Sequence, residues 1–97
     1  LLSGMTVEPG FYVLDEPESA LSFESSLALL QILGELVACG SQVLLATHSP
    51  VLAAMPGARL LQLGENGIEQ VAYDDTDLVQ GWRAFLDDPG RFLRHLG

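Results

Sequence analysis

The sequence predicts an α/β fold with parallel strands, a C-terminal β-hairpin and C-terminal helices. Two short apolar runs, residues 11–14 and 42–47, are rich in strand-forming residues, and residues 23–39 between them have helical periodicity. A strand, a helix and a strand in this order form a right-handed crossover, which joins two parallel strands of one sheet. Further along, a Gly-Glu-Asn-Gly tetrapeptide between two apolar runs predicts a hairpin.

The first strand, residues 11–14, is apolar at every position, which is typical of a strand buried on both faces. We expect the same of residues 42–47. In the helix, Ser22 is suited to cap the start and Gly40 to supply a left-handed residue at the end. One apolar face of this helix is formed by Leu27, Leu30, Leu33 and Val37, and it is predicted to face inward. Beside that face lie Leu29, Ile32 and Leu36.

A short helix and a hairpin follow the second strand. Ser49 and Pro50 end that strand, and we expect Ser49 to act as an ordinary cap. Residues 59–63 and 68–73 flank the tetrapeptide, whose Asn66-Gly67 pair favours a tight turn.

The tail, residues 74–97, predicts two helices, the second beginning at Asp88-Pro89. We expect the acidic cluster of Asp74, Asp75 and Asp77 to cap a helix, and the arginines to offset helix dipoles or to pair with Asp87 and Asp88. The whole chain is expected to form one domain, residues 1–97, with the sheet and crossover helix in 1–73. The apolar side chains expected to dock the tail on the sheet as core include Leu78, Trp82, Phe85, Leu86, Phe92, Leu93 and Leu96.

Composition and charge exclude several classes of protein. The 97 residues are enough for one small domain, and 48% of them are hydrophobic, so the chain is globular rather than disordered. Four basic and 13 acidic residues give a net charge of −9, which would repel phosphate backbones and does not support nucleic-acid binding by this chain. The single cysteine, Cys39, can form no intramolecular disulfide, so a reduced, cytoplasmic location is expected, and the residue itself is expected to be a small buried hydrophobe. No signal peptide or membrane-spanning run is found in the sequence.

Polar side chains follow both predicted strands at their carboxyl ends. Asp15 and Glu16 come after the first strand, and His48 follows the second. Because the carboxyl ends of parallel strands lie at one edge of a sheet, we expect these three side chains to lie close together. Because two adjacent residues on an extended chain point in different directions, the carboxylates of Asp15 and Glu16 can serve separate roles there.

These residues resemble three motifs of ABC-type ATPases. The run of four apolar residues before Asp15 and Glu16 resembles the Walker B motif, and Pro17 with the next residues resembles the D-loop. The sequence Ala-Thr-His-Ser-Pro at 46–50 is similar to the H-loop, and its Thr-His-Ser-Pro is closer to RecF-like and SMC-like members than to importer subunits. The D-loop-like residues are Ser19, Ala20, Leu21 and Ser22.

The resemblance implies a partial P-loop NTPase fold, an ABC ATPase-like three-layer sandwich, with ATP and Mg²⁺ as ligands. It implies that Asp15 anchors Mg²⁺ through water, that Glu16 acts as the general base and that His48 contacts the γ-phosphate. It also implies that residues 19–22 lie at the interface of a head-to-tail homodimer in the intact protein. The resemblance leaves open whether ATP hydrolysis drives transport, DNA repair or defence.

Other parts of the family pattern are missing from the chain. The phosphate-binding loop requires a lysine, and the sequence contains none. Leu2-Ser3-Gly4 begins like the family signature, but Met5 and Thr6 depart from it and Asp15 follows too soon. We therefore expect this chain to be the C-terminal part of one ATPase domain, inactive by itself and prone to dimerise or aggregate through an uncovered sheet.

Simpler interpretations stand beside these. Glu16 or Glu18 can merely cap the following helix, and His48 can be a structural histidine. The chain can also be a non-catalytic remnant or interaction module. Less favoured are a metal-dependent hydrolase using Asp15, Glu16 and His48, and a hydrolase with Ser49 as nucleophile, since no Gly-x-Ser-x-Gly motif is present.

Overall fold

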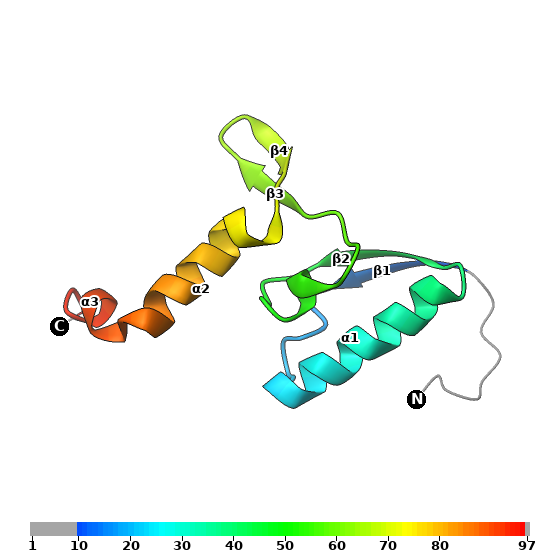
Figure 1. The fold of residues 1–97 in the computed structure, drawn as a ribbon, viewed down its shortest axis with the longest axis horizontal. Helices are drawn as coiled ribbons and strands as arrows, with labels where there is room; N and C mark the ends of the chain where they lie inside the picture. Colours follow the sequence, from blue (N-terminus) through cyan, green and yellow to red (C-terminus); the bar gives the residue numbers. More distant parts are fainter. Residues whose placement is uncertain (1–9, 97) are drawn as a thin grey trace. The chain divides into compact units, whose positions relative to one another are not determined.

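A computed structural model describes residues 10–96 of the chain (Figure 1). These residues form two compact units, the N-terminal unit (10–56) and the C-terminal unit (57–96). The elements of the N-terminal unit are β1 (Phe11–Asp15), α1 (Phe23–Ala38), β2 (Gln42–Ala46) and the 3₁₀ helix η1 (Leu52–Ala54). Those of the C-terminal unit are β3 (Leu61–Gly64), β4 (Gly67–Gln70), the 3₁₀ helix η2 (Tyr73–Asp75), α2 (Asp77–Asp87) and α3 (Pro89–Leu93).

The predicted crossover is confirmed, because β1 and β2 pair in parallel and α1 connects them. Phe11 lies opposite Gln42, and the register continues to Asp15 opposite Ala46. One further hydrogen bond extends the pairing beyond β1: the backbone N–H of Glu16 donates to the carbonyl of Ala46 at 2.7 Å. The chain therefore leaves both strands at the same edge of the sheet.

Helix α1 begins and ends close to the predicted positions. The Ser22 hydroxyl accepts a hydrogen bond from the backbone N–H of Ser25, which confirms the predicted N-cap. Gly40 has a φ of 93°, the left-handed conformation expected after a helix. The prediction that Cys39 is buried is wrong, because this residue forms the C-cap of α1, where the chain turns at the surface.

The core of the N-terminal unit lies between α1, β2 and η1. The predicted inward face is partly wrong, because Leu27 and Val37 are 45% and 51% exposed. The helix is apolar on more than one side, so periodicity alone does not decide which side packs on the sheet. The buried residues of this unit are Ser26, Leu33, Leu36, Ser41, Ser49, Leu52 and Ala53.

One face of the two-stranded sheet is open. Phe11 and Val13 are each 64% exposed and Leu44 is 57% exposed, so among residues 10–96 the strands are not buried on both faces as predicted. Side chains alternate along a strand, and the intervening positions, such as Leu14, are half-buried on the side of α1. Among the described residues a single helix, α1, packs on the sheet, and one helix covers only one face. An apolar strand sequence favours burial on both faces but does not provide the element that would cover the second one. The three-layer sandwich stays a prediction.

The predicted hairpin is confirmed as β3 and β4, which pair antiparallel from Leu61 opposite Gln70 to Gly64 opposite Gly67. The turn lies in the predicted tetrapeptide, with Gly64 paired to Gly67 on either side of it. Gly67 has a φ of 103°, whereas Glu65 and Asn66 keep negative φ, so the turn centres on Glu65-Asn66 and the glycine follows it.

The two C-terminal helices are confirmed, but the first has a different cap. The Thr76 hydroxyl accepts from the backbone N–H of Val79 at 3.2 Å, so the prediction that the acidic cluster caps this helix is wrong. Asp74 instead forms an ion pair with Arg83 at 2.8 Å. We had expected the arginines of the tail to offset helix dipoles or to pair with Asp87 and Asp88. Asp88 caps α3 as predicted, accepting from the backbone N–H of Arg91.

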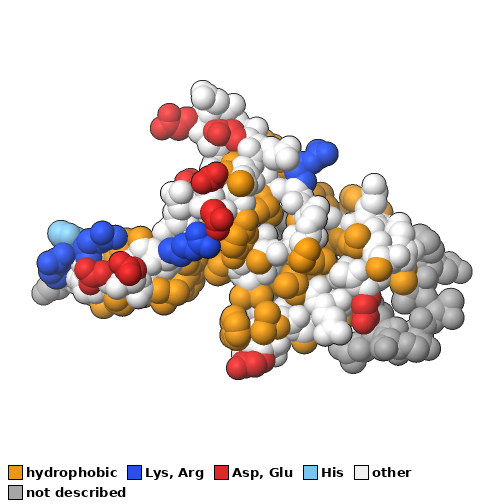
Figure 2. All heavy atoms as spheres, viewed as in Figure 1, with side chains coloured by type: hydrophobic (Ala, Val, Ile, Leu, Met, Phe, Trp, Pro, Cys, Tyr) orange, Lys and Arg blue, Asp and Glu red, His pale blue; other side chains and the backbone are white. Residues whose placement is uncertain are grey.

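The predicted core of the tail is largely exposed. Val79 is buried, whereas Trp82 and Leu86 are 46% and 67% exposed. Figure 2 shows hydrophobic side chains along one side of α2 and α3, with charged side chains on the other. Within its unit α2 packs mainly on η2 and the short α3, which leaves much of its apolar side uncovered. None of the helices in residues 10–96 has the length and hydropathy needed to cross a membrane.

Candidate functional site

Four polar residues lie where β1 and β2 end, and we call Asp15, Glu16, Glu18 and His48 the strand-end cluster. Nδ1 of His48 lies 2.6 Å from Oε1 of Glu16, a hydrogen bond between residues 32 positions apart. Asp15 pairs in register with Ala46, the last residue of β2. The structure thus confirms that the crossover brings the three predicted residues to one edge of the sheet.

The cluster is open to solvent. The side chains of His48 and Glu16 are 83% and 51% exposed, and Asp15 is also exposed. An exposed ion pair stabilises a fold by only about 0–1 kcal/mol, so this contact contributes little to folding. Its exposure leaves both groups accessible to a ligand from solution.

Glu16 has an unusual backbone conformation, with a φ of 46°. Residues other than glycine occupy this left-handed region at a cost of about 1–3 kcal/mol, and such residues concentrate at functional sites. Two backbone hydrogen bonds hold it in place: its N–H donates to Ala46, and its carbonyl accepts from Ser19 at 3.2 Å. The chain therefore turns sharply after Asp15, and the two adjacent carboxylates leave the backbone in different directions.

Glu18 is a member of the cluster that the sequence reasoning treated only as a possible cap. Its Oε2 accepts a hydrogen bond from the backbone N–H of His48 at 3.0 Å, 30 residues away, while Ser22 caps α1. Burial of the carboxyl opposes ionisation, but hydrogen bonds from the backbone of His48 and Glu18 and from the Thr47 side chain outweigh it and lower the pKa of Glu18. The signal in the sequence was a further acidic residue directly after Pro17.

The loop after β2 is held by short-range hydrogen bonds. The backbone N–H of Ser49 donates to the Thr47 hydroxyl at 2.9 Å. The Ser49 hydroxyl in turn accepts from Val51 and Leu52, at 3.2 and 3.3 Å, which confirms the expected capping role. Ser49 is buried and its hydroxyl is occupied at the start of η1, as a structural residue would be.

The D-loop-like residues 19–22 are all exposed. Two turns shape this segment, in which Ser19 N–H donates to the carbonyl of Glu16 and Leu21 N–H to that of Glu18. Its surface position fits an interface, and its role in a dimer stays a prediction.

The cluster fits a metal ion only in a limited way. Among residues 10–96, no group of three or more His, Cys, Asp or Glu side chains is placed to hold a metal ion. Mg²⁺ commonly binds proteins through one or two carboxylates and takes its other ligands from water and phosphate. The exposed carboxylate of Asp15 fits that mode of binding.

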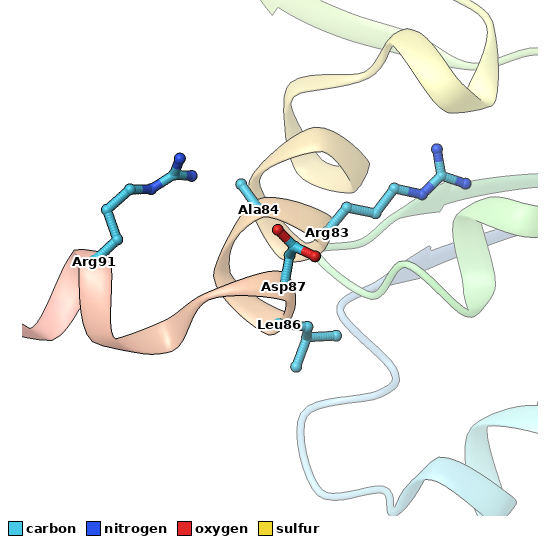
Figure 3. A pocket seen from close by; sticks show the side chains of 5 residues that line it. All are labelled: Arg83, Ala84, Leu86, Asp87 and Arg91. Atoms are coloured by element: carbon cyan, nitrogen blue, oxygen red, sulfur yellow. The ribbon is translucent and has the colours of Figure 1, made fainter.

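A shallow depression in the C-terminal unit is unrelated to the predicted site. It is lined by Arg91 of α3 and by Arg83, Ala84, Leu86 and Asp87 of α2 (Figure 3). The two guanidinium groups do not converge in Figure 3, and Arg83 is already paired with Asp74.

Comparison with known proteins assigns the N-terminal unit to a family. A family profile described as "AAA domain, putative AbiEii toxin, Type IV TA system" matches residues 2–54, more than half of the chain. The matched region includes all four residues of the strand-end cluster. Neither a curated protein nor a solved structure matches the chain significantly. The chain therefore belongs to this family of AAA domains, which are nucleotide-binding domains of the P-loop NTPase type.

Proposed function

We propose that this chain supplies the Walker B, D-loop and H-loop elements of an ABC-type ATPase, and that the complete protein binds and hydrolyses ATP. The observation that carries the proposal is the 2.6 Å contact between Glu16 and His48 at the end of two parallel strands, beside Asp15. A carboxylate base and a histidine at that edge are groups suited to in-line attack on a γ-phosphate.

Each residue has a separate role in this proposal. Glu16 orients the attacking water and accepts its proton, and His48 contacts the γ-phosphate from the neighbouring strand. Asp15 holds Mg²⁺ through a bound water, and the ion neutralises charge on the phosphate oxygens. The exposed segment 19–22 forms part of a head-to-tail homodimer interface.

The phosphate-binding loop comes from residues outside this chain in our proposal. Its lysine is essential for reaching the phosphates, and the sequence contains no lysine. The isolated chain is therefore expected to show no ATP turnover. The family description names a toxin, which favours a toxin–antitoxin system over transport as the process that ATP hydrolysis drives.

The direct test is Glu16→Gln in the complete ATPase. We expect kcat for ATP hydrolysis to fall by about 10²–10⁴-fold, because the amide cannot accept the proton. Nucleotide binding should be retained, because glutamine keeps the shape of the glutamate side chain. Phosphate release measures turnover, and a fluorescent ATP analogue measures binding.

The matched control is Glu65→Gln, which removes an exposed carboxylate at the hairpin turn and should leave turnover unchanged. Full turnover in Glu16→Gln would contradict the assignment of the base. A wild-type protein that neither binds nor hydrolyses ATP would favour a non-catalytic remnant or interaction module. Hydrolysis of a simple phosphodiester by the chain itself would instead favour a metal-dependent hydrolase.

A further inference from the structure

Two side chains from the loop after β1 hold His48 in different ways. Glu16 contacts the imidazole ring, with 2.6 Å between Oε1 and Nδ1. Glu18 contacts the main chain, because its Oε2 accepts from the backbone N–H of His48 at 3.0 Å. The ring and the backbone of one residue are thus attached to the same short loop.

The two contacts differ in how exposed the contributing glutamate is. Both partners of the Glu16–His48 contact are more than half exposed, so solvent competes for it and it holds the ring only loosely. Glu18 is half-buried, and a backbone N–H that donates to an ionised carboxylate makes a charge-assisted hydrogen bond, which is stronger than a neutral one. The Glu18 contact is therefore the one able to fix where His48 lies.

The surroundings of Glu18 favour its ionised form, in which it accepts this hydrogen bond most strongly. Although burial raises the pKa of the carboxyl, hydrogen bonds from the backbone of His48 and of Glu18 itself and from Thr47 bring the pKa below its ordinary value. Its second oxygen, Oε1, is buried and has no hydrogen-bond donor among residues 10–96.

We propose that Glu18 is a positioning residue for His48. It anchors the backbone of the histidine so that the ring meets Glu16. This inference rests on the proposed ATPase function. Glu18 acts through His48 and does not itself contact substrate.

The test compares Glu18→Ala with Glu18→Gln in the complete ATPase. Alanine removes the acceptor for the His48 N–H, and we expect kcat to fall by about 10- to 100-fold with KM for ATP nearly unchanged. Glutamine keeps an oxygen at the same reach, so kcat should stay within about threefold of wild type. Glu24→Ala removes an exposed carboxylate from the first turn of α1 and serves as the control.

A second measurement is independent of activity. Hydrogen exchange of the His48 amide in the chain should be at least about tenfold faster in Glu18→Ala than in wild type, and unchanged in Glu18→Gln and Glu24→Ala. If Glu18→Ala does not fold, Glu18→Asp replaces it, because the shorter side chain keeps the charge but loses the reach to His48. We expect the same loss of kcat from that variant.

Wild-type kcat in a folded Glu18→Ala variant would overturn the inference, as would equal losses in the alanine and glutamine variants. Unchanged exchange at His48 would overturn it as well. If the wild-type protein does not hydrolyse ATP, the proposed ATPase function is wrong, but the contact between Glu18 and His48 can still be tested. The exchange measurement then still decides whether Glu18 anchors His48.

Discussion

The two units of this chain use their polar side chains differently. In the N-terminal unit, hydrogen bonds from His48 reach Glu16 and Glu18, which lie 32 and 30 positions away. In the C-terminal unit, polar contacts are more local: the backbone N–H of Asp77 reaches Gln62, 15 residues away. A parallel crossover brings distant residues together, whereas hairpins and successive helices join near neighbours. The comparison explains why the candidate site lies in the N-terminal unit.

The two units also differ in how many of their residues are buried. Seven of the nine buried residues among 10–96 lie in the N-terminal unit, and the C-terminal unit contributes Thr76 and Val79. Both units expose large apolar side chains, such as Phe11 and Leu63. Most of the packing that stabilises the described residues is therefore in the N-terminal unit.

The largest expected effect on stability is at Leu52, which is 1% exposed in η1. Leu52→Ala should lower the free energy of unfolding by about 2–5 kcal/mol, because it removes buried methyl groups and leaves a cavity. Leu63→Ala, at an 81% exposed position of the hairpin, is the matched control and should change it by less than about 0.5 kcal/mol. Chemical denaturation measures both, and equal effects would contradict the burial of Leu52 in the core of the N-terminal unit.

The next largest loss of stability is expected from removing a helix cap, either Thr76 of α2 or Ser22 of α1. Thr76 is buried, and its hydroxyl both accepts from Val79 and donates to the carbonyl of Tyr73 at 2.9 Å. Thr76→Ala should destabilise the chain by about 1–2 kcal/mol, and Ser22→Ala, at the exposed cap of α1, by about 0.5–1 kcal/mol. Thermal unfolding of the two variants ranks them, and the reverse order would contradict the burial of Thr76.

A smaller change in the free energy of unfolding is expected when the pH is lowered. The pKa of Glu18 is lowered in the folded chain from an ordinary value of 4.5, so its ionised form stabilises the fold above that pH. This contribution should be lost as the pH falls below 4.5 and through the folded-state pKa. Urea unfolding of wild type and Glu18→Gln should show a constant difference at neutral pH that shrinks on acidification. A difference that grows in acid would contradict the direction of the shift, and Glu24→Gln controls for removal of an exposed carboxylate.

The smallest effect is expected at the ion pair between Arg83 and Asp74, whose side chains are 61% and 72% exposed. Asp74→Asn should change the free energy of unfolding by less than about 1 kcal/mol, and the change should diminish further in high salt. Unfolding at low and high ionic strength measures it. A large, salt-independent loss would show that this pair organises the C-terminal unit.

The sequence predicted the elements well because their signals are local. The order of strand, helix and strand, the Ser22 cap, the hairpin and the Asp88 cap all depend on neighbouring residues, and all are confirmed. The meeting of Glu16 and His48 was also predictable, since parallel strands place their carboxyl ends at one edge.

The errors concern burial and choice of partner. Leu27, Val37 and Cys39 were expected inside and are exposed, because the apolar pattern of α1 does not specify which side faces the sheet. Thr76 caps α2 in place of the acidic cluster, because the residue at the first non-helical position decides the cap.

The sequence by itself determined the class of fold, the parallel crossover and the residues that end its strands, because periodicity, turn residues and motif spacing act over short distances. Only the tertiary structure decided that Glu18 binds the backbone of His48 and that one face of the β1–β2 sheet stays open. A hydrogen bond across 30 residues depends on how two loops approach each other, and the cover of a sheet depends on how many helices pack against it. Neither is encoded in a local pattern.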